Sequence, residues 1–111
     1  MNAEELKHKI RDIFGEQIVF NKEFDDCAEA IKSLDDDLIT WCILIKDRKI
    51  RPISKSVLGD QIVFIKKIGS SNRCLIIKIK NGEFKEIHLG DHKYYNYLTA
   101  ALGLKESSQT Y

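Results

Sequence analysis

The stretch that most constrains the fold runs from residue 61 to residue 90 and reads QIVFIKKIGSSNRCLIIKIKNGEFKEIHLG. It contains three segments rich in β-branched and aromatic residues, which are typical of strands, at residues 61–68, 73–80 and 83–89. Asn81-Gly82 joins the last two, and this pair tolerates the positive φ angles of a type I′ turn. The stretch therefore predicts a three-stranded antiparallel meander.

The middle segment of this stretch has two different faces. Alternate side chains of a strand point to opposite faces of the sheet. One face of residues 73–80 is apolar, with Leu75, Ile77 and Ile79. The other carries a mixed set that becomes basic towards its end, Cys74, Ile76, Lys78 and Lys80. The pattern predicts a core side and a wetter, basic side.

The N-terminal part of the chain is predicted to be mainly helical. Apolar residues at helical spacing indicate a first helix over Ala3–Phe14, with Asn2 as its N-cap and Gly15 as its stop. The segment QIVFN at residues 17–21 indicates a short strand. A second helix is expected from about residue 21 to residue 34.

The next helix is harder to assign. Three aspartates at residues 35–37 are expected to break the chain and to cap the segment after them. The apolar run LITWCILI at residues 38–45 fits a buried strand as well as a buried helix. The charges at its two ends favour a helix over residues 38–48, which would form an antiparallel αα-hairpin with the preceding helix.

These elements predict one α+β domain covering residues 1–111, with its core at residues 17–104. Residues 1–15 form an extra N-terminal helix, and residues 51–59 form an extended connector. A C-terminal helix is expected at residues 92–102, followed by a flexible tail at residues 105–111. The helices are expected on one side of a largely antiparallel sheet.

Composition limits the classes of function. No apolar run reaches transmembrane length, no N-terminal signal is recognisable, and three cysteines lack metal spacing, which together predict a cytoplasmic protein with reduced thiols. Nucleotide-hydrolysis and metal-catalysis motifs do not occur, so no cofactor and no metal are expected.

Charge is distributed unevenly along the chain. Residues 1–49 hold eight basic and 12 acidic side chains, whereas residues 50–111 hold ten basic and five acidic ones. The sheet half is therefore expected to meet an anionic partner, although two ordinary solvated surfaces would give the same asymmetry.

Two short motifs lie at the ends of the expected strands, GSSNR at residues 69–73 and GDHKYYN at residues 90–96. With Leu38 and Trp41, and with the order strand, two helices, three strands, they resemble the RelE/ParE superfamily of toxins from toxin–antitoxin pairs. The local sequence is similar to the HigB branch. The resemblance covers residues 17–98. Asp91 stands where that branch has Thr, and Asn96 where it has Asp.

The resemblance implies a ribosome-dependent mRNA endoribonuclease that inhibits translation without a metal, by attack of a ribose 2′-OH on the adjacent phosphate. It implies that Arg73 stabilises the phosphate and that His92 is acid or base. Tyr95 would be a proton donor or a platform for a base, and Lys66 a neighbouring cation, with Lys67 as second choice. Five residues are expected to bind RNA: Lys67, Lys78, Lys80, Lys93 and His88.

Implied partners are mRNA, the ribosome and a cognate antitoxin protein, with no membrane. Two alternatives stay open. The first keeps the fold without catalysis and acts by binding RNA or protein, as ParE-like members act on gyrase. The second is an unrelated α+β interaction module in which Arg73 and His92 are ordinary surface residues.

Overall fold

A computed structural model describes residues 2–31, 34–52, 60–69 and 71–103. Within these residues the chain forms helices and strands in the order α1 (Ala3–Phe14), β1 (Val19–Phe20), α2 (Phe24–Ala30), α3 (Leu34–Lys46), β2 (Gln61–Ile68), β3 (Asn72–Ile79), β4 (Phe84–Asp91) and α4 (His92–Ala101). The expected α+β class is therefore confirmed. The predicted tail at residues 105–111, and most of the predicted connector, lie outside the described residues.

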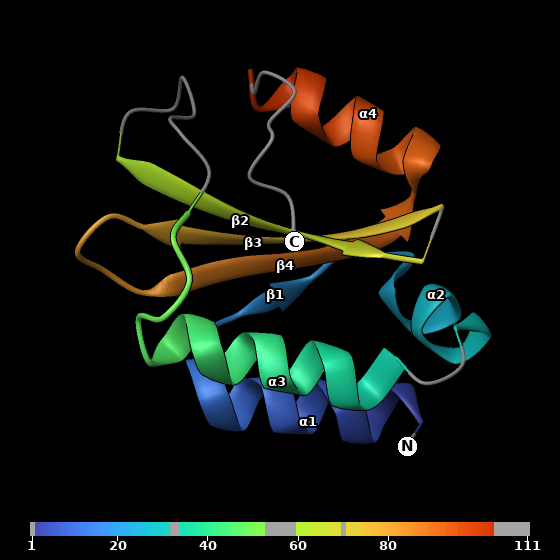
Figure 1. Ribbon diagram of the computed structural model, residues 1–111, viewed down its shortest axis with the longest axis horizontal. Helices are drawn as coiled ribbons and strands as arrows, with labels where there is room; N and C mark the ends of the chain where they lie inside the picture. The colour runs from blue at the N-terminus through green and yellow to red at the C-terminus, as the bar shows by residue number, and fades with distance from the viewer. Residues whose placement is uncertain (1, 32–33, 53–59, 70, 104–111) are drawn as a thin grey trace.

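The strands form one mixed sheet in the order β1-β4-β3-β2 (Figure 1). Strands β2 and β3 are antiparallel over their whole length, and β3 and β4 are antiparallel with one irregularity between Ile77 and Lys78. The short strand β1 instead runs parallel to β4 and pairs Val19 with Glu86. This arrangement places β1, which comes early in the chain, beside the last strand.

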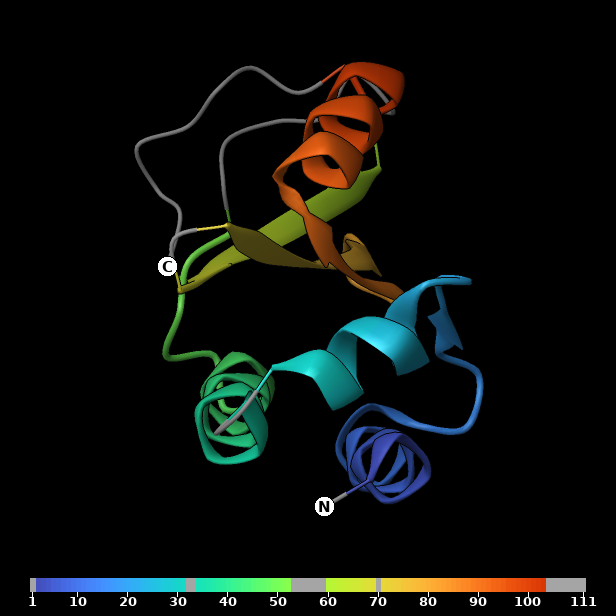
Figure 2. The same ribbon diagram turned by 90° about the vertical axis from the view of Figure 1, so that its right-hand side faces the viewer.

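Helices cover both faces of the sheet, so the prediction that they gather on one side is wrong. Helices α1, α2 and α3 lie on one face and α4 lies on the other (Figures 1 and 2). The reason is visible in β3, where both faces are apolar. Cys74 and Ile76 are buried in the core beneath the three helices, whereas Leu75 and Ile77 are buried with Tyr95 of α4 in a second core. The expected wetter side of β3 is therefore largely a core side.

Helix α1 has the predicted bounds. The Asn2 side chain accepts a hydrogen bond from the Glu5 N–H at 2.9 Å, as an N-cap does. Gly15 ends the helix at φ +109°, and its N–H donates to the Arg11 carbonyl. Because a Cβ is strained at this angle, glycine suits the position.

The predicted αα-hairpin does not form. Helix α3 begins at Leu34, so the aspartates at residues 35–37 lie inside its first turns. The helix dipole favours acidic residues at this end of a helix. Helix α3 packs along α1, whereas α2 packs against α1 and β4 and crosses the direction of α3 (Figure 2). No described helix is long and apolar enough to cross a membrane.

The β3–β4 hairpin forms at Asn81-Gly82, but its turn is not type I′. Asn81 has φ +63°, whereas Gly82 lies outside the left-handed region. The Gly82 N–H donates to the Ile79 carbonyl at 2.8 Å, and the Ile79 N–H donates to Glu83 at 2.9 Å. A type I′ turn needs positive φ at both central residues, so this loop is a longer one that contains a single left-handed residue.

Candidate functional site

Three of the predicted site residues meet around the ring of Tyr95. The guanidinium carbon of Arg73, on β3, lies 5.7 Å from the centroid of this ring. The His92 ring, on α4, has its centroid 6.2 Å from that of Tyr95. Tyr95 is 8% exposed, Arg73 is half-buried and His92 is exposed. The arrangement presents a cation and an imidazole together at the surface.

The junction between β4 and α4 produces this geometry. Helix α4 begins directly after β4, and the Asp91 side chain caps it by accepting a hydrogen bond from the Tyr94 N–H at 2.9 Å. His92 and Tyr95, three residues apart, share a face of the helix. Arg73 pairs with Gly90 on the neighbouring strand. Asp91 therefore has a structural role at the position where the resembled branch has Thr.

The cation beside Arg73 is Lys67, not Lys66. Lys67 is directly opposite Arg73 in the β2–β3 register, whereas Lys66 is opposite Cys74. Side chains alternate along β2, so Lys66 shares the face of the three-helix core and Lys67 shares the face of α4. The placement of Lys66 with Arg73 is therefore wrong, and the second choice takes its position.

The other predicted RNA-binding lysines divide between two ends of the molecule. Lys93 is exposed in the first turn of α4, next to His92. Lys78 lies about 16 Å along β3 from Arg73, and its ammonium stands over the Phe84 ring in the opposite layer. Lys80 follows β3, where its N–H donates to the Asp60 carbonyl. Neither Lys78 nor Lys80 joins the surface around Arg73.

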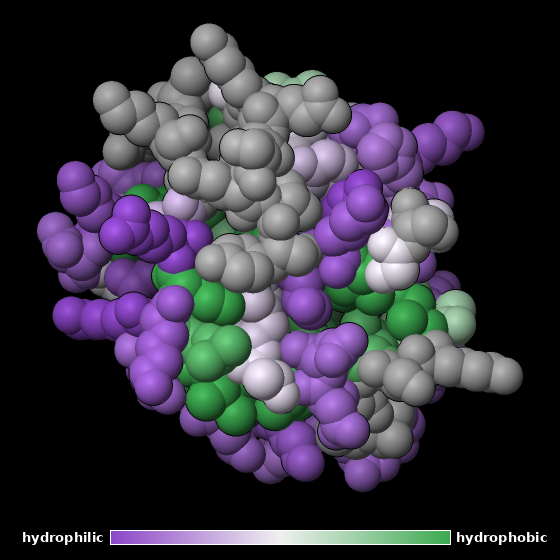
Figure 3. Space-filling model, viewed as in Figure 1, coloured by the Kyte–Doolittle hydropathy of each residue, from purple (hydrophilic) through white to green (hydrophobic). Residues whose placement is uncertain are grey.

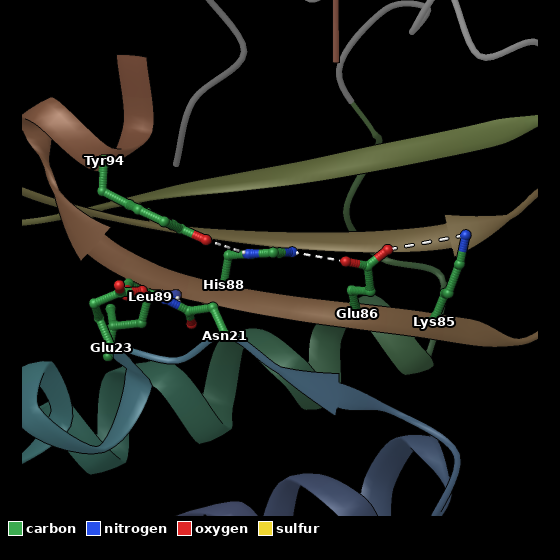
Figure 4. A network of polar contacts seen from close by, with 7 residues as sticks. All are labelled: Asn21, Glu23, Lys85, Glu86, His88, Leu89 and Tyr94. Carbon is green, nitrogen blue, oxygen red and sulfur yellow. Dashed lines mark hydrogen bonds and ion pairs between the residues drawn. The ribbon is translucent and has the colours of Figure 1, made fainter. Parts of the chain in front are cut away.

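His88, also predicted to bind RNA, is held in a polar network on β4 (Figure 4). Its Nδ1 lies 2.7 Å from the Tyr94 hydroxyl, and its Nε2 lies 3.0 Å from Glu86 Oε1. Because a carboxylate only accepts, Nε2 donates to Glu86, and in the neutral imidazole Nδ1 then accepts from the Tyr94 hydroxyl. The His88 side chain is 13% exposed, which leaves little of it for a ligand.

The side chain of Asn21, in the chain segment after β1, forms hydrogen bonds with the backbone of β4 beside His88. Its Oδ1 accepts from the Leu89 N–H at 2.9 Å, and its Nδ2 donates to the Leu89 carbonyl at 2.9 Å. Burial, and then the carboxylate of Glu23, raise the pKa of Tyr94. Sequence reasoning missed this network. The only signal was the Glu86-x-His88 spacing, which places both side chains on one face of β4.

Metal binding has no geometric support within the part of the chain that the structure describes, since no three His, Cys, Asp or Glu side chains gather there. No protein-family profile, characterised protein or solved structure matches the chain.

Proposed function

We propose that this chain is an RNA-cleaving toxin of the RelE/HigB type, a ribosome-dependent mRNA endoribonuclease. The observation that carries the proposal is the contact of both Arg73 and His92 with the Tyr95 ring. Cleavage by a ribose 2′-OH needs a group that moves protons and cations that stabilise charge on the phosphate. An imidazole and a guanidinium that both lie next to one ring would supply these two requirements.

Arg73 would bind the scissile phosphate, because its fork of N–H groups matches two phosphate oxygens. Lys67 stands directly opposite Arg73, and like charges in this position are destabilising. A bound phosphate would relieve that repulsion. Their juxtaposition therefore supports an anionic ligand at this point of the surface.

His92 would act as acid or base, since it is exposed and its ring is oriented by the ring of Tyr95. Tyr95 is 8% exposed, which leaves little of its ring on which a base could stack. We therefore assign Tyr95 as a positioning residue that sets the separation of Arg73 and His92.

The test is incubation of the purified protein with translating ribosomes and mRNA. The variant Arg73→Ala with His92→Ala is expected to lose cleavage by at least about 100-fold. A matched control is Arg11→Ala with His8→Ala on α1, where Arg11 stands 4.9 Å from the centroid of the Phe20 ring. The control should cleave normally. Cleavage that survives the first double substitution would show that the site lies elsewhere.

A non-catalytic function is the second candidate, in which the same surface binds RNA or a protein such as gyrase. The burial of Tyr95 favours it, because a phenol in this position is poorly placed to protonate a leaving oxygen. Controlled expression in cells separates the two candidates. Growth arrest with intact mRNA selects binding, and growth arrest with cleaved mRNA selects catalysis. In either case a cognate antitoxin is the expected protein partner.

A further inference from the structure

A second candidate site lies on the opposite face of the sheet from Arg73. It is a groove of about 940 Å³ between the end of α3, the segment after it and the β3–β4 hairpin. Figure 1 shows these three parts together at one end of the molecule, and apolar and hydrophilic side chains adjoin one another there in Figure 3. The volume is within the range of about 300–1,000 Å³ typical of small-ligand sites.

The groove combines an apolar floor with a basic rim. The floor includes three phenylalanines from separate elements, Phe14, Phe64 and Phe84. The charged residues that line the groove are four cations and one carboxylate, Lys46, Arg48, Arg51, Lys78 and Glu83. This excess of positive charge around an apolar floor suits a ligand that has an apolar body and an anionic group.

Two of the cations converge on one ring. The ammonium of Lys46, from α3, lies 6.0 Å from the centroid of the Phe84 ring, and that of Lys78, from β3, lies 5.6 Å from it. Lys78 also donates to the Ile79 carbonyl at 3.1 Å. Within the described residues neither ammonium forms an ion pair with a carboxylate. Two cations therefore lie near one ring, and no carboxylate of those residues is ion-paired with either of them.

We propose that this groove binds a nucleotide, with its phosphate between Lys46 and Lys78 and its base against the half-buried apolar lining of Pro52 and Ile62. A cation–π contact of this kind is weak at an exposed site. A charge-assisted hydrogen bond to phosphate is stronger, so the two ammonium groups gain by turning from the ring to the ligand. A phosphate also matches the surplus of positive charge better than a single carboxylate does.

The nucleotide has two possible sources, a free mononucleotide or one unit of a single RNA strand. Both present the same phosphate and the same flat base. The site does not depend on the proposed cleavage function, because it lies on the other face of the sheet and shares none of Arg73, His92 and Tyr95. Its test therefore requires no cleavage.

The experiment is a titration followed by amide NMR, first with adenosine 5′-monophosphate and then with a single-stranded oligoadenylate of eight nucleotides. We expect saturable shifts of groove residues such as Ile62 and Phe84. The variant Lys46→Gln with Lys78→Gln should weaken this binding at least tenfold. The matched control Lys9→Gln with Lys22→Gln removes the same charge from outside the groove and should bind normally.

The two probes distinguish the sources. Groove shifts with the mononucleotide assign a free nucleotide, and groove shifts with the oligoadenylate alone assign an RNA strand. The proposal is overturned if neither probe shifts the groove resonances, or if the shifts persist unchanged in folded Lys46→Gln/Lys78→Gln protein. Both lysine side chains reach solvent, and urea unfolding of the variant confirms that it is folded.

Discussion

The guanidinium carbon of Arg73 lies 5.7 Å from the centroid of the Tyr95 ring, so a residue of β3 contacts a residue of α4. The same ring also orients His92. The Tyr95 ring therefore lies next to both a cation and an imidazole that belong to different elements.

This relationship predicts different effects for two substitutions of Tyr95. Tyr95→Phe keeps the ring and should leave kcat for RNA cleavage nearly unchanged. Tyr95→Leu removes the ring and should lower kcat by up to about 100-fold, because small displacements of reacting groups are costly. The measurement is single-turnover cleavage by each variant, with KM determined separately. An equal loss in both variants would instead make the Tyr95 hydroxyl the acting group.

The two adjacent lysines of β2 provide a second prediction. Lys67→Gln should weaken RNA binding and reduce the slope of log affinity against log salt by about 0.7, the value for one phosphate contact on a single strand. Lys66→Gln removes the same charge from the opposite face and should change neither quantity. RNA affinity of each variant, measured from low to moderate salt concentration, tests both expectations. Equal effects of the two substitutions would mean that the RNA does not discriminate between the faces.

The sequence predicts the local elements better than their packing. Helix α1 was predictable because Leu6, Ile10 and Phe14 repeat at helical spacing between a cap and a glycine. The start of α3 was missed because an aspartate run indicates a break as readily as a first turn. The position of α4 was missed because an apolar strand such as β3 does not reveal that each of its faces has its own helical layer.

The candidate site shows the same limit. The gathering of Arg73, His92 and Tyr95 followed from short motifs at strand ends. The choice between Lys66 and Lys67 could not be made from these motifs, because it depends on which face of β2 each side chain occupies. The spacing of Glu86 and His88 was visible in the sequence, but the contact of His88 with Tyr94 requires the helix to fold back over Gly90. A Cβ on Gly90 would lie 2.5 Å from a carbon of the Tyr94 ring, so only glycine accommodates this approach.

The Tyr94 hydroxyl makes a pH-dependent contribution to stability. Tyr94→Phe removes its hydrogen bond to His88 and should lower the free energy of unfolding by about 1 kcal/mol at neutral pH. Burial raises the pKa of Tyr94 in the folded protein, so above pH ~10 the unfolded chain loses this proton first. The advantage of Tyr94 over Phe should therefore be full below that pH and should shrink above it.

Urea unfolding of both proteins at neutral and alkaline pH measures this difference, and the other ionisable groups are common to the two. A gap between the proteins that widens above pH ~10 would contradict the raised pKa of Tyr94.

The three thiols should differ in reactivity. Burial raises the pKa of Cys42 to about 12 and that of Cys74 well above its ordinary value. Burial, and then the carboxylate of Asp91, also raise the pKa of the half-buried Cys27. Since the thiolate is the reactive form, iodoacetamide near pH 8 should modify Cys27 slowly and leave the other two thiols intact.

Mass spectrometry of the native and the urea-unfolded protein provides the measurement, and all three thiols should react after unfolding. Native Cys27→Ser protein should remain unmodified. Rapid modification of Cys42 in the native protein would mean that α3 detaches readily from the core.

Arg48 occupies a position at the end of α3 that glycine normally favours. It has φ +60°, its N–H donates to the Ile45 carbonyl, and the Lys49 N–H donates to the Leu44 carbonyl. This pair of bonds is a Schellman motif with Arg48 as its left-handed residue. A side chain costs about 1–2 kcal/mol in this conformation, whereas glycine loses more entropy on folding.

We therefore expect Arg48→Gly to raise the free energy of unfolding by about 0.5–1 kcal/mol. Lys49→Gly is the matched control, because Lys49 is not left-handed and glycine there should lower stability by a similar amount. Urea unfolding of the three proteins measures both changes. Destabilisation by Arg48→Gly would mean that the Arg48 side chain itself stabilises the fold, for instance by packing over the groove that it lines.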